Sequence, residues 1–193
     1  MLCWKRGRDG AGTRLATLDN DLAVKLWDAN SGKMLYAFPG PAVLDGANLW
    51  FSADGRWLLI ADCQGTVTVR VAKTAALVRR FASGATCILD VAMSPDGKLI
   101  AASNNQRETH ILDFESGQEL LILPGGFTIQ FSPDGTRLVV AGQESSPTGG
   151  HTVGVYFLHL NDLVELAKAR VTRTLTLEEC KQYLPSETCP IPQ

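Results

Sequence analysis

The chain has 193 residues, of which 45% are hydrophobic and 20% are charged, and its formal net charge is −2. This composition supplies enough apolar material for the core of one domain, or of one domain with a small appendage. The small net charge gives no electrostatic basis for binding nucleic acid or an anionic membrane. The sequence shows neither a signal peptide nor an apolar run near the roughly 18 residues that span a bilayer, so we expect a cytoplasmic protein.

The first segment, residues 1–11, is basic and rich in glycine. It reads "MLCWKRGRDGA" and lacks the apolar alternation of a strand. We therefore expect a disordered or irregular segment here, with its positive charges in solvent rather than in a binding patch.

One short motif recurs through the following 150 or so residues at intervals of about 40 residues. It reads "FSADG" at 51–55, "MSPDG" at 93–97 and "FSPDG" at 131–135, and Gly12 in "GTRLAT" lies one further interval upstream. Pro, Asp and Gly at these places suit a tight turn. The sequence thus predicts repeated units near 12–46, 47–84, 85–125 and 126–160.

Each unit has the same order of short strands. An apolar strand precedes the turn and a second follows it, as in "ILDVAMS" and "KLIAASN" of the third unit. A third strand comes next, and the first three units add a fourth, such as "KMLYAF" and "QELLIL". Several strands alternate apolar and polar residues, which is typical of half-buried strands. We therefore expect an all-β fold with antiparallel hairpins at 52–55, 94–97 and 132–135.

The pattern "SPDG…LWD…SGK" resembles the WD-repeat β-propellers, and Trp27-Asp28 is the intact signature dipeptide. The resemblance covers residues 12–160. It implies about four radially arranged blades, and because propellers of this family usually have more, it implies the C-terminal arc of a longer propeller. We expect the first unit to lack its inner strand and the last unit to lack its outer strand. Such open ends predict a marginal chain that self-associates or depends on further blades.

In the family, a His, an Asp, a Ser or Thr and the Trp form a buried hydrogen-bond network. Asp21 stands at the Asp position of the first unit, whereas the other units have Gln64, Gln106 and Gly150 there. The three histidines of the chain lie away from the family's His position: His110, His151 and His159. We therefore expect no complete network, and stability that rests on apolar packing between blades.

The tail, residues 161–193, has a different pattern. Apolar residues at helical spacing begin near Leu163, and Thr176 with Glu179 forms a capping box. Two short helices are therefore expected. The run "LTLEECKQYL…TCP" resembles tails that close the WD-repeat sensor regions of large bacterial signalling proteins, which implies a bacterial origin and a regulatory role.

The cysteines are five in number: Cys3, Cys63, Cys87, Cys180 and Cys189. Their spacing matches neither a disulfide framework nor a metal site, so we expect reduced thiols. A redox pair of Cys180 and Cys189 is the alternative to independent thiols in the tail.

The sequence offers no catalytic, cofactor-binding or metal-binding residues. It lacks a phosphate-binding loop, a nucleophile elbow and an HExxH motif. The recurring carboxylates are explained by turn formation: Asp54, Asp96 and Asp134. We interpret His110 as an ordinary strand residue rather than a ligand.

Two classes of function remain. The first is a non-catalytic scaffold or sensor that binds other proteins or peptides through loops on one face. The second is an enzyme or small-molecule binder that uses the propeller axis, which requires titratable groups on several inner strands. The expected inner strands are apolar apart from Asp90 and Gln130. We therefore expect the scaffold.

Overall fold

The computed structural model describes residues 5–8, 11–41, 47–82, 87–143 and 151–158. The chain divides into two units, Met1–Tyr156 and Phe157–Gln193, and the sheets lie in the first unit apart from Phe157. Within the described ranges every regular element is a strand. The expected tail helices, with Thr176 and Glu179, lie outside the described residues, as do Cys180 and Cys189.

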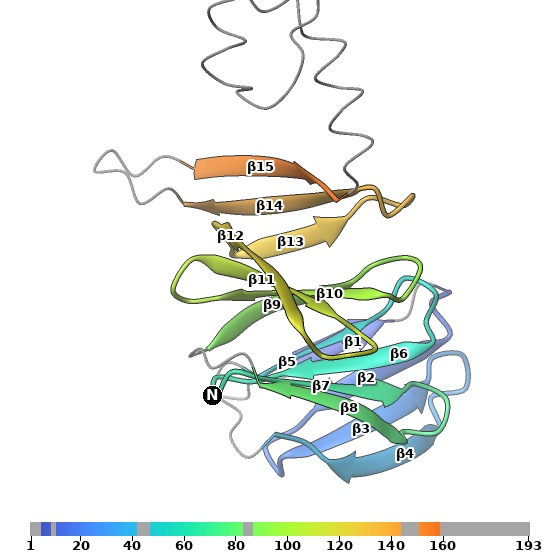
Figure 1. Ribbon diagram of the computed structural model, residues 1–193. Helices are drawn as coiled ribbons and strands as arrows, with labels where there is room; N and C mark the ends of the chain where they lie inside the picture. Colours follow the sequence, from blue (N-terminus) through green and yellow to red (C-terminus); the bar gives the residue numbers. More distant parts are fainter. Residues whose placement is uncertain (1–4, 9–10, 42–46, 83–86, 144–150, 159–193) are drawn as a thin grey trace, which may run out of the picture. The chain divides into compact units, whose positions relative to one another are not determined.

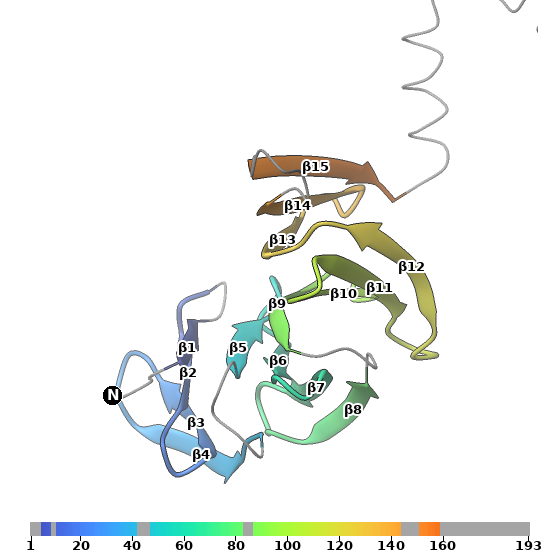
Figure 2. The same ribbon diagram turned by 90° about the vertical axis from the view of Figure 1, so that its left-hand side faces the viewer.

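The strands form four antiparallel sheets that follow one another along the chain, which we call blades 1 to 4 (Figures 1 and 2). Blade 1 comprises β1 (Lys5–Arg8), β2 (Arg14–Leu18), β3 (Ala23–Asp28) and β4 (Met34–Pro39). Blade 2 comprises β5 (Asn48–Phe51), β6 (Trp57–Ala61), β7 (Thr66–Val71) and β8 (Leu77–Ala82). Blade 3 comprises β9 (Ile88–Met93), β10 (Leu99–Asn104), β11 (Glu108–Asp113) and β12 (Glu119–Pro124). Blade 4 comprises β13 (Thr128–Phe131), β14 (Arg137–Gln143) and β15 (His151–Phe157). This all-β arrangement of consecutive blades is the propeller-like fold that the repeat predicts.

Within every sheet the strands follow chain order, from the inner strand to the outer one. The inner strands of successive blades contact each other: β1 with β5, β5 with β9, and β9 with β13. Hydrogen bonds join them as well. The Asn48 amide donates to the Leu89 carbonyl at 3.4 Å, and the Ile129 amide donates to the Asp90 carboxylate at 2.9 Å. The blades are thus tied together along their inner strands.

The core lies between the faces of adjacent blades. One buried cluster joins blades 1 and 2 and includes Leu18, Leu26 and Leu58. A second cluster joins blades 2 and 3 and includes Leu59 and Ile100. Leu58 and Leu59 are neighbours on one strand and serve opposite clusters, because successive side chains of a strand point to opposite faces. A middle strand that packs against a blade on each side is therefore apolar throughout rather than alternating.

The expected hairpin turns are confirmed at 52–55, 94–97 and 132–135. In each turn the glycine amide donates to the carbonyl of the serine three residues earlier, at 2.8 to 2.9 Å. The turn glycines have positive φ angles, 67° at Gly55, 74° at Gly97 and 73° at Gly135. This left-handed conformation explains why glycine recurs at the last position of the motif.

Residues 1–11 were expected to be irregular, but part of this segment forms a strand. Residues Lys5–Arg8 form β1, which pairs antiparallel with β2 along its length, from Lys5 opposite Leu18 to Arg8 opposite Leu15. Blade 1 therefore has its inner strand, and the prediction that it lacks one was wrong. Backbone pairing with β2 and contact with β5 supply the strand's stability, and neither is visible in a local pattern of charge and glycine.

Blade 4 is the incomplete sheet. Its described strands have the order β13-β14-β15, so it has three strands where each other blade has four. The expectation that the last unit lacks an outer strand agrees with the sheet as the described residues form it.

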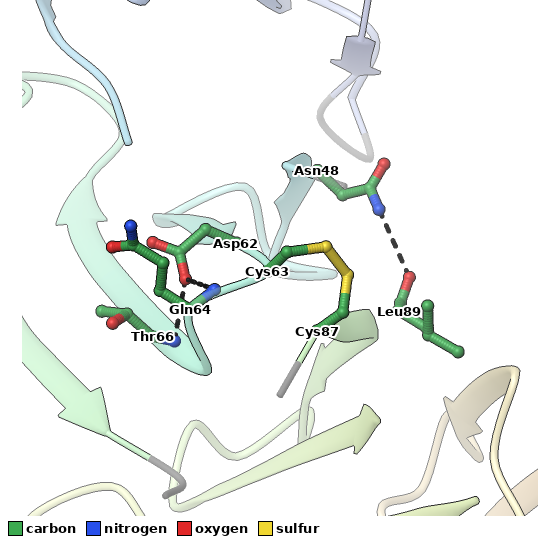
Figure 3. Close-up of a disulfide and its surroundings, with 7 residues drawn as sticks. All are labelled: Asn48, Asp62, Cys63, Gln64, Thr66, Cys87 and Leu89. Carbon is green, nitrogen blue, oxygen red and sulfur yellow. Dashed lines mark hydrogen bonds between the residues drawn. A yellow bond between two sulfur atoms is a disulfide. The ribbon is translucent and has the colours of Figure 1, made fainter. Parts of the chain in front are cut away.

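The cysteines of blades 2 and 3 differ from the expectation of reduced thiols, because Cys63 and Cys87 are joined by a disulfide (Figure 3). Cys63 lies in the turn between β6 and β7, and Cys87 immediately precedes β9. The Ile88 amide donates to the Asp62 carbonyl at 3.1 Å, which holds the two chain segments together. The pairing depends on this contact between blades, which cysteine spacing does not show.

Candidate interaction surface

The outer strands carry apolar side chains that the fold leaves in solvent. On β12 the exposed fractions are 54% for Leu120, 50% for Leu121 and 46% for Ile122. The outer strands of blades 1 and 2 show the same feature at Met34, Leu35, Tyr36, Leu77 and Val78. Exposed apolar groups in such runs mark interaction sites more often than chance surface positions. We call these residues, with those of β12, the outer apolar surface.

The exposure of consecutive residues has a direct structural cause. Neighbouring residues of a strand point to opposite faces, so both faces of these strands are uncovered along their first half. β8 and β12 are anchored near their other ends, where Phe81 is 5% exposed and Leu123 is 7% exposed. In β4 the partly buried Phe38 packs against the cluster between blades 1 and 2. The neighbouring blades thus cover the middle strands but not the beginning of the outer strands.

Blade 4 also carries exposed apolar side chains, on its edge strand. β15 is the last strand of its three-stranded sheet among the described residues, and its side chains include Val153 and Val155, which are 67% and 52% exposed. The Tyr156 hydroxyl donates to the Pro124 carbonyl of blade 3 at 3.2 Å and fastens this strand to its neighbour. An edge of this kind can accept a further strand.

The carboxylates of the repeated turns are occupied by the turns themselves. In blade 3 the Ser94 hydroxyl donates to Asp96 at 2.6 Å and accepts the Leu99 amide at 2.9 Å, while the Lys98 amide donates to Asp96 at 3.0 Å. Ser52 with Asp54 and Ser132 with Asp134 repeat this arrangement. Hydrogen bonds from Ser132 and Thr136 lower the pKa of Asp134 to about 2. These aspartates keep their charge to organise a hairpin, as the turn interpretation predicts.

Of the two polar residues expected on inner strands, only Asp90 is partly buried. Its carboxylate accepts hydrogen bonds from the amides of Val91 and Ile129, each at 2.9 Å, and from the Trp50 side chain. Burial raises the pKa of Asp90 in spite of these bonds. Gln130 is exposed. Asp90 therefore links blades 2, 3 and 4 and does not converge with Gln130 on a shared site.

His110 lies on β11 and is 5% exposed. Its ring contacts the Asn104 side-chain amide at 3.2 Å and the Glu119 carboxylate at 2.5 Å. Glu108 lies 3.6 Å from the ring's other nitrogen. Asn104 also accepts the amides of Gln106 and Glu108, each at 3.0 Å, so it caps the turn before β11. His110 and Asn104 are buried, whereas Glu108 and Glu119 are partly exposed. The sequence does not predict this polar cluster, because it indicates only an ordinary strand residue at His110.

The family network is present only in part. In blade 1 the Trp27 indole donates to the Thr17 hydroxyl at 2.9 Å. Asp21 instead accepts the Ala23 amide at 3.1 Å and binds the Lys25 ammonium at 3.0 Å. The hydrogen bond between Trp27 and Thr17 therefore forms without Asp21, so blade 1 has only part of the expected network. His151 is described for its backbone only, and His159 lies outside the described residues.

The described residues hold no cluster of three or more His, Cys, Asp or Glu side chains arranged to bind a metal ion. The same residues form no helix that is long and apolar enough to cross a membrane. Alternation of apolar and polar residues does not predict the outer apolar surface, although "KMLYAF" and "ELLIL" carry a signal for it. Their apolar residues are consecutive in strands that lie at the end of a sheet, where burial on both faces is absent.

Comparison with known proteins places the chain near propeller proteins. No family model matches it. It is 28% identical over 143 residues to the WD repeat-containing protein SL1-17 of Schistosoma mansoni, a match that covers 70% of this chain and 46% of the relative. Among solved structures, Kuenenia stuttgartiensis hydrazine synthase superposes with a TM-score of 0.67 at 15% identity, over 80% of this chain and 45% of the other.

These similarities support a coarse assignment. Because its sequence identity is low, the structural match shows the fold alone. The sequence match relates the chain distantly to a WD-repeat protein. The chain spans about half the length of the curated relative it matches. A bacterial origin, a signalling role and a cytoplasmic location remain predictions.

Proposed function

We propose that this chain is a non-catalytic interaction module, part of a scaffold or sensor, that binds other proteins or peptides. The outer apolar surface carries the proposal, because the same half of the outer strand is exposed and apolar in three successive blades. A rigid row of sheets can present such strands to a partner without rearrangement. The relation to a WD-repeat protein supports the same class of function.

The proposal moves the contact from the loops of one face, which the sequence favours, toward the outer strands. In the Ser–Asp turns, the polar side chains form hydrogen bonds within the turn itself. The apolar residues of β4, β8 and β12 have no such internal use at their exposed ends. A partner that covers them gains roughly 25 cal/mol for each Å² of apolar surface removed from water.

The test uses the full chain with a substitution that keeps the fold. Leu121→Glu places a charge on the outer apolar surface, and Gln118→Glu places the same charge on an exposed residue just before β12. Partners are identified by crosslinking in extracts of the source organism and are then purified and titrated. We expect Leu121→Glu to weaken the reconstituted complex about tenfold or more, and Gln118→Glu to change it less than about twofold.

Two results would contradict the proposal. One is a reconstituted complex whose dissociation constant is the same for both variants and the wild type. The other is turnover of a defined substrate by the purified chain, lost on substitution of Asp90. That second result would support the alternative, a propeller enzyme or small-molecule binder that uses the axis. The similarity to hydrazine synthase does not favour it, since a match at 15% identity shows the fold alone.

A further inference from the structure

A cavity of about 260 Å³ lies between blades 1 and 2. The segment that follows β4 forms one wall, through Pro39, Gly40 and Pro41. The opposite wall is the face of blade 2 that packs toward blade 1, and it includes the buried Ile60. The other lining residues of blade 2 are polar.

Strand register explains why the polar residues gather on one face. Thr66, Thr68 and Arg70 alternate along β7, so their side chains point the same way. Arg80 of β8 is the direct cross-strand partner of Thr68. The two arginines therefore share a face and line the same cavity.

The two arginines line the same cavity, and neither forms an ion pair with a described acidic residue. Arg70 lies over the Phe38 ring, 4.3 Å from its centroid, and its Nη1 donates to the Ala75 carbonyl at 2.8 Å. Its buried Nε has no hydrogen-bond partner. Burial and then the charge of Arg80 lower the pKa of Arg70, the direction expected when a neighbouring positive charge is not neutralised. Arg80 is exposed and forms no ion pair with a described residue.

One carboxylate belongs to the cavity wall, and its contacts are already made. Asp62 is 7% exposed, and one of its oxygens accepts the amides of Gln64 and Thr66 at 2.9 and 3.0 Å. The cavity thus combines two arginine charges with one internally bonded carboxylate. The side-chain hydroxyls of Thr66 and Thr68 add donors on the same face.

We propose that this cavity is a binding site for a phosphate group, held by Arg70 and Arg80 with the hydroxyls of Thr66 and Thr68. A dianion would offset the repulsion of the two arginines, and guanidinium groups bind phosphate oxygens with paired hydrogen bonds. Arg70 is already fixed by Phe38 and Ala75, while the exposed Arg80 is free to close on the ligand. The cavity accepts either free phosphate or the phosphate of a monoester, and the experiment separates these sources.

The test is isothermal titration of the full chain with inorganic phosphate and, separately, with phenyl phosphate, against sodium chloride of matched ionic strength. Arg80→Gln removes one of the two charges. Arg79→Gln is the matched control, because it makes the same change one residue away on the face toward blade 3, where Arg79 lies near the Phe114 ring. We expect Arg80→Gln to weaken binding about tenfold or more and Arg79→Gln to change it less than about twofold.

Arg70→Lys provides a second variant that keeps the charge but loses the paired donors, and we expect it to weaken binding while the circular dichroism spectrum stays unchanged. Tight binding of inorganic phosphate identifies free phosphate as a sufficient ligand, and binding of phenyl phosphate alone identifies a monoester; both support the site. Absence of binding of either probe at about 10 mM by folded wild type overturns it. Equal weakening by Arg79→Gln and Arg80→Gln also overturns it, because that result shows a general effect of charge.

Discussion

β10 and β12 belong to the same sheet and are separated only by β11, yet their environments are opposite. On β10, Ile100, Ala101 and Ala102 are each 0% exposed, whereas three consecutive apolar residues of β12 are about half exposed. Both strands are apolar in sequence. Apolar content alone therefore does not fix burial in this fold, because the position of a strand within its blade decides whether neighbouring blades cover it.

The same contrast recurs in the other complete blades. In blade 2 the middle strand β6 is buried at four of its five residues, whereas the outer strand β8 is exposed at four of its six. In blade 1, β2 is buried at three of its five residues and β4 is exposed at five of its six. A difference that repeats with the blade is a property of the architecture and not of one residue. It divides each blade into a part that holds the protein together and a part that remains available for contact.

The largest expected effect tests this division directly. Ile100→Ala removes a fully buried side chain from the core between blades 2 and 3 and should lower the free energy of unfolding by about 4 kcal/mol. Leu121→Ala, on the outer apolar surface, should change it by less than about 0.5 kcal/mol. Denaturant unfolding measures both. A comparable decrease in the free energy of unfolding of the two variants would show that β12 is covered in solution.

The disulfide between Cys63 and Cys87 should give the next largest effect. It closes a loop with a sequence separation of 24 residues, for which chain entropy gives about 3 kcal/mol. Reduction should therefore lower the melting temperature of the wild type. The melting temperature of the Cys63→Ala, Cys87→Ala double variant should not change on reduction. Peptide mapping without reductant provides the independent check: absence of a Cys63–Cys87 crosslinked peptide would contradict the pairing.

Asp90 should give the smallest effect, and its sign is diagnostic. Burial raises its pKa in the folded protein, so the folded state binds the proton more tightly than the unfolded state does. Stability from this residue therefore increases as the pH falls from neutral toward the ordinary value of 3.8 and decreases as the pH rises. Relative to Asp90→Asn, the wild type should gain stability on acidification. The measurement is the free energy of unfolding of the wild type and of Asp90→Asn. A difference between the two that is constant from pH 7 to pH 4 would show that Asp90 is not buried as a carboxylate.

The repeat made much of this fold predictable. The recurring Ser, Asp and Gly of each turn encode a local hydrogen-bond pattern, so residues 94–97 specify their hairpin without help from distant parts of the chain. The flanking strands follow from alternation and from runs that are apolar throughout. The order of strands within a blade was predictable for the same reason.

The features that were missed all depend on contacts between segments far apart in sequence. β1 is held by β2 and β5, the Cys63–Cys87 pair by the meeting of blades 2 and 3, and the arginine-lined cavity by the side of β7 that faces blade 1. The sequence predicts that His110 is a strand residue, as the structure shows, but its contact with Glu119 depends on the register of β11 against β12. Local patterns carry no information on such registers.

The serine-to-aspartate turns have a further consequence for how the chain acquires its structure. Each one closes a hairpin between strands that are neighbours in sequence, with donors and acceptors supplied by residues at most five positions apart. Contacts over so short a separation form at a small cost in loop entropy, and proteins rich in them fold quickly for their size. Three equivalent hairpins thus give the chain three independent starting points for folding, from which blades can grow outward and then associate.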